Sequence, residues 1–451
     1  MVVNVQEYVM NKLATRIAMQ SLAVIVGLML AISAHAGVNI QHWQAKSGAK
    51  VLFVENHDLP MLDVAVWFDA GSRRDDPAKA GRAGLVSHML QLGAAGMGEE
   101  EIAKQLADIG AQLGGSFDRD RSGYALRTLS SAREREQALS AMAAVLQKPD
   151  FPEAVLEREK TRLIAVLKEA ETKPDSIADK AFYKAVYGEH PYALPESGEL
   201  ETVAKLKRQD LINFYDGHYV ASKAVVVLIG DVKRSEAEAI AEQLTGGLGD
   251  QAACGTSEEK VPAPQAKTLR LPHPATQAHI LMGAPGMQRI DPDYFPLLVG
   301  NYVLGGGGFD SRILKEIRQK RGLAYSAHSY FLPYQQPGPF EIGVQTKKGD
   351  AEAALKVLRE TLAKFIQDGP SEAELKQARN NIVLGFPLRI DSNRKLLDYL
   401  GVIGFYDLPL TYLEDYPRAV SKVTAAQVRD AFQRRVHPDK LVTVIVGGPE
   451  K

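Results

Sequence analysis

The stretch from Leu304 to Tyr325 carries residue types that could act on a substrate. It begins with four consecutive glycines (Gly305, Gly306, Gly307 and Gly308), and Tyr325 follows Arg318 by seven positions. A guanidinium that stays charged and a phenol O–H can both donate hydrogen bonds to negative charge that develops on a reacting carbonyl oxygen. The same residue types also occur in ordinary turns, surfaces and packed strands, so their identities alone leave a structural role open.

Short-range signals predict how this stretch is built. Four adjacent glycines would cost much backbone entropy inside a helix or strand, so they predict a tight turn or a close approach of another chain segment. Ser311 is a good N-cap residue, apolar residues follow it at helical spacing, and Gly322 is a typical helix stop. The pattern therefore predicts a short helix with Arg318 in its last turn, and then a strand that Tyr325 enters. No GxxxxGK[ST] motif accompanies the glycines, which argues against a phosphate site.

The composition is that of a globular protein with more than one core. The chain has 451 residues, of which 45% are hydrophobic and 24% are charged, and its formal net charge is −1. No region has a sustained excess of lysine and arginine, so nucleic acid is not an expected partner. Cys254 is the only cysteine, which excludes an intramolecular disulfide and a cysteine metal cluster.

The N-terminal residues predict export. Lys12 and Arg16 precede an apolar run from Ile17 to Ile32, which ends in an A-x-A pattern at Ala36. This is the pattern of a signal peptide over residues 1–36, although an uncleaved membrane anchor is the alternative. After cleavage, no other segment is long and apolar enough to cross a membrane. The mature protein is therefore expected in a bacterial periplasm.

The rest of the chain alternates predicted strands and helices, as in an α+β protein. Strands are expected at 51–56, 61–71, 124–130 and 224–232, and helices at 84–92, 99–113, 134–146, 152–170 and 210–215.

An internal repeat indicates a duplication. A G-x-x-R-x-D-P motif that begins at Gly71 recurs at Gly286, 215 positions later, and Glu101-Ile102 recurs as Glu316-Ile317 at the same offset. The sequences AVVVLIG and LVTVIVG follow Lys223 and Lys440 near the ends of the two halves. The repeats predict two similar α+β domains in tandem, each an antiparallel-rich sheet packed with helices. The predicted domains are residues 38–248 and 268–451, and the polar, Pro/Gly-containing stretch 249–267 is the predicted linker.

Several motifs together resemble the pitrilysin/insulysin-type metallopeptidases, the inverzincins that include mitochondrial processing peptidase. The first half has the G-S-R framework at 71–85 and YGEHPYALPESG at 187–198. The second half has LGGGG-x-x-SR-x-x-x-x-IR-x-x-x-GLAYS and, later, GFPLRIDSN. The resemblance runs from about Val51 to Gly447, which is nearly the whole mature chain.

The zinc motif of that family is absent here. Its H-x-x-E-H motif supplies two histidine ligands and a general base. Aligned on Gly84-Leu85, the three positions are Ser87, Leu90 and Gln91, and the third ligand position falls at or beside Val166. A slip of one residue recovers only His88, which we interpret as an ordinary residue on a packed helix. The resemblance therefore implies no metal and no cofactor in this chain.

The resemblance assigns a different role to the second half. In the family, an arginine and a tyrosine seven residues apart face the zinc across a chamber, and Arg318 and Tyr325 match them. The implied protein is the non-zinc subunit of a periplasmic heterodimeric peptidase, inactive alone, whose homologous H-x-x-E-H partner supplies the zinc. Gly305 to Gly308 would border the chamber and bind the peptide substrate.

Two other classes of protein remain open. One is a catalytically inactive scaffold or assembly protein of the same fold. The other is a self-sufficient homodimeric hydrolase, which nothing supports because Cys254 lies in the predicted linker and no G-x-S-x-G motif occurs.

Overall fold

A computed structural model describes residues 38–250 and 260–447. The predicted signal peptide and Cys254 lie outside the described residues. The described residues from Ile40 onward form one compact unit. Within the described part, no helix has the length and apolar character needed to span a membrane.

The first sheet lies in the N-terminal half and has six strands, mostly antiparallel. Its central strand β8 has the sequence VVVLIG and is buried along its whole length, as expected where both faces of a sheet are covered. The parallel pair is β2 with β8, and β6 is an edge strand. In spatial order the strands are β1 (Gln41–Gln44), β2 (Lys50–Glu55), β8 (Val225–Gly230), β3 (Met61–Phe68), β7 (Ser122–Leu129) and β6 (Gln112–Phe117).

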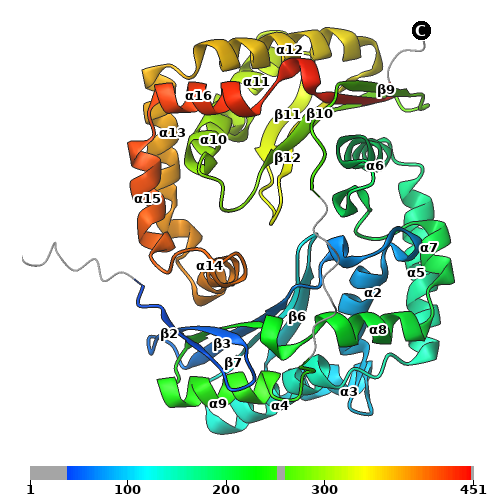
Figure 1. Cartoon of the computed structure of the whole chain (residues 1–451), viewed down its shortest axis with the longest axis vertical. Helices are drawn as coiled ribbons and strands as arrows, with labels where there is room; N and C mark the ends of the chain where they lie inside the picture. Colours follow the sequence, from blue (N-terminus) through cyan, green and yellow to red (C-terminus); the bar gives the residue numbers. More distant parts are fainter. Residues whose placement is uncertain (1–37, 251–259, 448–451) are drawn as a thin grey trace, which may run out of the picture. The chain divides into compact units, whose positions relative to one another are not determined.

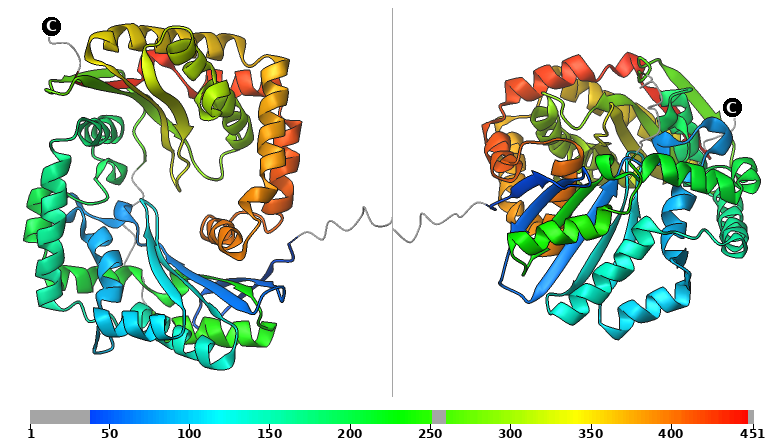
Figure 2. Two further views of the ribbon diagram at one scale, coloured as in Figure 1. Left: turned by 180° about the vertical axis from the view of Figure 1, so that it is seen from behind. Right: turned by 60° about the horizontal axis from the view of Figure 1, so that its bottom comes forward.

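Helices pack on this sheet and share one hydrophobic core with it. Figure 2 shows the helices of the first half gathered around the sheet, with α4 and α9 side by side. A two-residue hairpin, β4 (Gly93–Ala94) and β5 (Met97–Gly98), follows α2. The helices are α2 (Arg82–Met89), α3 (Glu99–Asp108), α4 (Ala132–Gln147), α5 (Glu153–Ala170), α7 (Leu200–Lys205), α8 (Arg208–His218) and α9 (Arg234–Thr245).

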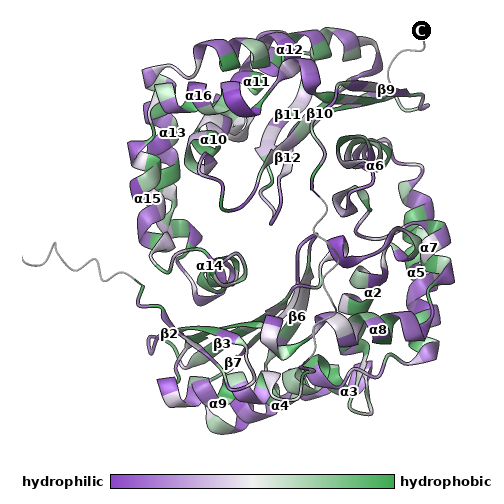
Figure 3. Ribbon diagram, in the orientation of Figure 1, coloured by the Kyte–Doolittle hydropathy of each residue, from purple (hydrophilic) through white to green (hydrophobic). Residues whose placement is uncertain are grey.

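The second sheet lies in the C-terminal half and repeats the pattern with five strands. In spatial order they are β11 (Ala324–Phe331), β12 (Gly338–Lys347), β10 (Gln277–Met287), β13 (Val442–Val446) and β9 (Lys267–Leu271). Amphipathic helices cover it, and Figure 3 shows hydrophobic and hydrophilic bands along α12. The helices are α10 (Tyr294–Asn301), α11 (Arg312–Leu314), α12 (Ala351–Asp368), α13 (Glu372–Gly385), α15 (Tyr412–Lys422) and α16 (Ala425–Arg435).

Each half also lends one helix to the sheet of the other half. Helix α6 (Pro174–Tyr187) packs on β10 and β13, and α14 (Asn393–Phe405) packs on β3 and β8 (Figure 1). Glycines permit the close approach of α14, because a Cβ on Gly401 would lie 2.5 Å from Nε1 of Trp67. The exchange makes each core depend on both halves.

A buried carboxylate links the two halves. Asp120 is fully buried in the loop before β7, and it accepts hydrogen bonds from the hydroxyls of Tyr192 (2.7 Å) and Tyr406 (2.8 Å). It also accepts a hydrogen bond from the backbone N–H of Gln335 at 2.7 Å. Tyr406 and Gln335 belong to the second half. Asp120, in the first half, therefore receives two of these three hydrogen bonds from the second half.

The predicted α+β class with two similar halves is confirmed, whereas the residue limits of the domains and linker stay predictions. Several predicted boundaries were wrong: the strand expected over 61–71 ends at Phe68, and the helix expected over 210–215 is Arg208–His218. The largest error is the helix expected over 99–113, which ends at Asp108, and Gly110 follows with a φ of +65°. The next residues form the edge strand β6. Its sequence QLGGSF hides the strand pattern, because two adjacent glycines carry no side chains to alternate.

Candidate functional site

The helix that carries Arg318 follows the predicted plan. Ser311 is its N-cap in an extended conformation, and α11 continues as a π-helical turn over Lys315–Gln319. Ile317 is buried beneath it, whereas Arg318 is exposed. The helical turn ends at Gln319, and the chain reverses at Gly322, which has a φ of +63° and donates its N–H to the carbonyl of Arg318 at 2.9 Å. The backbone thus presents the guanidinium toward solvent.

Tyr325 enters strand β11, as predicted, at an irregular point of that strand. The pairing of β11 with β12 shifts register between Ala324 and Ser326, so Tyr325 occupies a β-bulge. Bulges redirect side chains, and here the tyrosine is 70% exposed.

Arg318 and Tyr325 share an absence of strong polar partners. Across residues 38–250 and 260–447, neither side chain has a hydrogen bond or an ion pair with protein. The Arg318 guanidinium lies over the ring of Phe309, with its Cζ 5.2 Å from the ring centroid. Both side chains are therefore available to an external group.

The glycine run differs from the expected turn. Gly305 and Gly306 lie inside a π-helical turn, Tyr302–Gly306, that continues α10, and only Gly308 adopts a positive φ, of +61°. The expectation that the glycines avoid helical backbone was wrong for Gly305 and Gly306. The alternative expectation, a close approach of another segment, is confirmed at Gly305. A Cβ on Gly305 would lie 2.3 Å from Oγ of Ser329, so β11 leaves no room for a side chain there. Gly306 and Gly308 are exposed.

The positions that align with the zinc ligands and the general base carry no imidazole or carboxylate, and Gln91 among them is half-buried. Ser87 is buried, and its Oγ receives a 2.8 Å hydrogen bond from Ser122. Leu90 is completely buried in the core of the first half, and Val166 is 59% exposed. Nowhere in the described part of the chain do three His, Cys, Asp or Glu side chains form a group that could hold a metal ion.

A small pocket of about 290 Å³ lies between α2 and α5. It includes His88, whose Nε2 is 3.2 Å from a carboxylate oxygen of the buried Glu159. Burial raises the pKa of Glu159, but hydrogen bonds from Arg158 and His88 and the charge of Arg162 together lower it below its usual value. The sequence suggested that His88 is an ordinary residue on a packed helix. In the structure its side chain is half-exposed and pairs with the carboxylate of Glu159.

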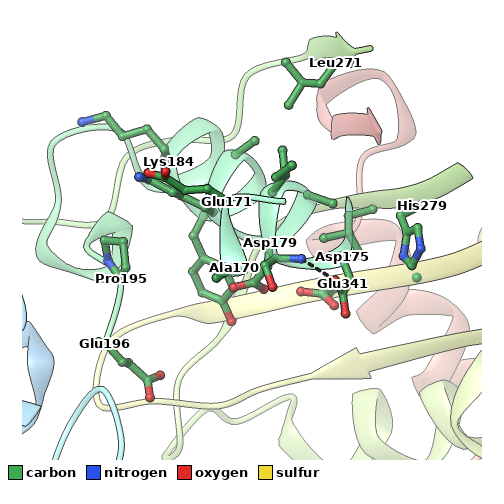
Figure 4. Close-up of a pocket in the computed structure, with 18 of the residues that line it drawn as sticks. Ala170, Glu171, Asp175, Asp179, Lys184, Pro195, Glu196, Leu271, His279 and Glu341 are labelled. Carbon is green, nitrogen blue, oxygen red and sulfur yellow. Dashed lines mark hydrogen bonds between the residues drawn. The ribbon is translucent and has the colours of Figure 1, made fainter. Parts of the chain in front are cut away.

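A larger pocket of about 1040 Å³ lies where α6 meets the second sheet (Figure 4). Acidic side chains on its wall include Asp175, Asp179 and Glu341. Burial, assisted by the nearby charge of Asp179, raises the pKa of Glu341 to about 7, although Arg119 opposes the shift. Sequence reasoning missed this pocket. The spacing of Asp175 and Asp179 places them on one helix face, but nothing local shows that this face meets the other half.

Two similar α+β halves in tandem are the architecture of the inverzincin metallopeptidases, although Ser87, Leu90 and Gln91 replace the H-x-x-E-H motif in this chain. The family description "Insulinase (Peptidase family M16)" matches residues 50–198, and "Peptidase M16 inactive domain" matches residues 205–382. A solved structure titled as a peptidase M16 inactive domain from Pseudomonas fluorescens is 37% identical, with a TM-score of 0.88. The match covers 91% of this chain and 99% of that one. The chain belongs to peptidase family M16.

Some relatives are named as peptidases and one as a non-peptidase. The "Non-peptidase homolog YmxG" of Helicobacter pylori is 27% identical over 95% of this chain and 98% of its own. The "Uncharacterized zinc protease YmxG" of Bacillus subtilis is 26% identical over 80% of this chain and 87% of its own. The beta subunit of mitochondrial-processing peptidase from Blastocladiella emersonii is 23% identical over 90% and 88%, respectively. Since the aligned ligand positions carry no imidazole or carboxylate, these similarities fit a family member that binds no zinc and has no peptidase activity alone.

Proposed function

We propose that this chain is the non-zinc subunit of a periplasmic heterodimeric zinc metallopeptidase, in which it supplies Arg318 and Tyr325 to the zinc site of a homologous partner. The observation that carries the proposal is the exposure of both side chains without a hydrogen bond or ion pair among the described residues. The contact of Arg318 with protein that the structure records is its cation–π contact with the ring of Phe309. The aligned ligand positions of the first half, Ser87, Gln91 and Val166, carry no imidazole or carboxylate and so do not provide a metal site in the same chain.

Each residue has a defined task in this proposal. The zinc of the partner would supply a nucleophilic hydroxide from bound water. Negative charge then develops on the oxygen of the scissile carbonyl, where the Tyr325 O–H donates a hydrogen bond and Arg318 provides a fixed positive charge. The exposed Gly306 and Gly308 allow the peptide backbone to approach. An edge strand such as β11 offers backbone groups for pairing with an extended peptide.

The test uses the mature chain together with an H-x-x-E-H subunit of family M16 from the same organism. Tyr325→Phe removes only the donor, so complex formation by size exclusion should persist while kcat on a quenched peptide falls about 10²–10³-fold. KM should change much less, because the hydrogen bond strengthens as charge develops. Arg318→Lys keeps the charge but loses the planar fork, and it should also lower kcat.

Tyr330→Phe is the matched control. Tyr330 lies on the same strand and is 45% exposed. Pairing of β11 with a peptide uses backbone groups, so loss of the Tyr330 hydroxyl should leave kcat unchanged. If Tyr325→Phe forms the complex and turns over at the wild-type rate, the active-site role is wrong.

Two measurements on the chain itself complete the test. Metal analysis of the purified chain should find no stoichiometric zinc, since Ser87, Leu90, Gln91 and Val166 provide no ligand set. Mass spectrometry of the natively expressed protein should find Gly37 at the N-terminus. One tightly bound zinc per chain with chelator-sensitive activity, or an intact N-terminus in the membrane fraction, would contradict the corresponding part of the proposal.

A catalytically inactive scaffold is the second candidate function. The name of the Helicobacter pylori relative, a non-peptidase homolog, favours it. In that case Tyr325→Phe and Arg318→Lys would have no effect on any turnover, and the chain would still assemble with its partners.

A further inference from the structure

Arg318 differs from the other basic residues of its segment in the group that it contacts. Of the five lysines and arginines over 312–321, four form ion pairs: Arg312 with Glu374, Lys315 with Asp310, and Lys320 and Arg321 with Glu316. Within the described ranges, Arg318 has no carboxylate partner, and its guanidinium lies over the ring of Phe309, with Cζ 5.2 Å from the ring centroid. The nearby carboxylates are therefore paired with other cations, and an aromatic ring takes their place beside Arg318.

Phe309 does not serve a hydrophobic core. Its side chain is 66% exposed, and it is the one phenylalanine of residues 38–250 and 260–447 that is exposed rather than buried or half-buried. Burial is what makes a phenylalanine stabilising, so a ring that stays in solvent contributes little to folding. The ring is therefore available for a role in the contact with Arg318.

The backbone turn that carries Phe309, Gly308–Asp310, is held in place at each of its residues. Gly308 accepts a hydrogen bond from the Ser311 hydroxyl (2.7 Å), Phe309 from the Gln319 side chain (2.9 Å), and Asp310 from the Gln377 side chain on α13 (2.8 Å). Gln319 directly follows Arg318, so its hydrogen bond to the carbonyl of Phe309 ties the turn to the helical segment that carries the arginine. The ring and the guanidinium are thus brought together by a fixed backbone.

We propose that Phe309 is a positioning residue for Arg318, whose guanidinium it holds in place while the N–H groups stay free for the substrate. The inference rests on the proposed function, because it takes Arg318 to act on the carbonyl oxygen of a peptide. A carboxylate would hold the arginine more strongly, but it would occupy N–H donors and offset the positive charge. The face of an aromatic ring attracts the cation and brings no negative charge of its own. Fixing a long side chain before the reaction also reduces the entropy that must be lost in the transition state.

The first test measures turnover of a quenched peptide by the mature chain together with its H-x-x-E-H subunit. Phe309→Leu keeps an apolar side chain but removes the ring, so kcat should fall about two- to fivefold, as expected for an exposed cation–π contact. KM should change less, because Arg318 acts mainly on charge that develops in the transition state. Phe309→Trp keeps a ring that attracts cations well and should retain the wild-type kcat.

The second test determines whether the effect of Phe309 depends on Arg318. In an Arg318→Gln background, Phe309→Leu should cause no further loss of kcat, because the cation that the ring holds is gone. Leu59→Ala, at a 58% exposed leucine between β2 and β3, is the control for losing an exposed apolar side chain and should leave kcat unchanged. Equal losses from Phe309→Leu in both backgrounds would overturn the inference, because the ring would then act on the turn or on the substrate directly.

The third test uses proton–nitrogen NMR of the mature chain without a partner. Protons above the face of an aromatic ring are shielded, so the Nε–H proton of Arg318 should resonate upfield of its position in Phe309→Leu. Arg318→Lys assigns this signal by removing it. The same chemical shift with and without the ring would mean that the contact does not persist in solution, which would overturn the inference.

The positioning role and the proposed function fail through different results. If Tyr325→Phe and Arg318→Lys slow turnover but Phe309→Leu does not, or if Phe309→Trp loses as much activity as Phe309→Leu, only the positioning role is wrong. If Tyr325→Phe turns over at the wild-type rate, the proposed function is wrong, and the positioning role has no reaction to serve.

Discussion

The region that aligns with the zinc ligands and the region of Arg318 and Tyr325 differ in what their side chains contact. Leu90 and Ser87 are buried, and the Ser87 hydroxyl is hydrogen-bonded within the protein. Arg318 and Tyr325 are exposed and, among the described residues, lack polar protein partners. Positions without a chemical task are free to serve the core, whereas side chains that act on a ligand must stay accessible. The contrast supports a role for the second half in binding or catalysis, while the first half is structural at this point.

The largest expected effect on stability comes from restoring a zinc-motif residue type in the first region. Leu90→Glu restores the residue type of the general base but places a carboxylate at a completely buried position. We expect a loss of about 3–5 kcal/mol in the free energy of unfolding, because a buried charge without a partner is costly. Urea unfolding of Val166→Glu is the control, since Val166 is 59% exposed and should tolerate the change. A small effect of Leu90→Glu would mean that the site can still open for a metal.

The next largest effect involves the pocket beside α6. In the folded state the pKa of Glu341 is about 7, above its usual value of 4.5, so the folded protein binds more protons between these values. Stability should therefore fall as the pH rises through this window. Glu341→Gln should stabilise the protein by up to about 3 kcal/mol at pH 8 and have little effect at pH 4.5.

The control for this pH prediction is Glu360→Gln, an exposed glutamate on α12. Thermal unfolding of both variants across the pH range separates the buried carboxylate from a general charge effect. Equal behaviour of the two variants would remove Glu341 as the cause.

A smaller effect is expected at Gly305, where the glycine run near Arg318 packs against β11. Gly305→Ala would place a Cβ 2.3 Å from Oγ and 2.5 Å from the backbone N of Ser329. Because a backbone atom cannot yield easily, we expect a loss of roughly 1–3 kcal/mol. Gly385→Ala at the end of α13 has no atom within 4 Å of its new Cβ and should be neutral or slightly stabilising in the same thermal assay.

The smallest effect on stability concerns His88 in the pocket between α2 and α5. His88→Ala removes one partner of Glu159, but hydrogen bonds from Arg158 (2.6 Å) and Arg162 (2.9 Å) persist. The stability loss should stay below about 1 kcal/mol. His42→Ala, at an exposed histidine on β1, gives the baseline. A loss several times larger would show that His88 is central to this half.

The sequence by itself determined the local features of the candidate site. Ser311 as N-cap, Gly322 as helix stop and the strand at Tyr325 are encoded by neighbouring residues, since caps, turns and side-chain periodicity act over a few positions. The loss of the zinc ligands and the duplication are likewise properties of the residue string. These signals were sufficient for the α+β class and the family.

Only the tertiary structure decided which surfaces meet. The exchange of α6 and α14, the hydrogen bonds to Asp120 from Tyr406 and Gln335, and the acidic pocket join residues from different halves of the chain. An amphipathic helix shows that it needs an apolar partner but not which sheet supplies one. The need for glycine at position 305 arises in the same way, because it comes from Ser329 on a strand that packs against it. Such choices depend on shape and packing summed over the whole fold, which no short stretch of sequence contains.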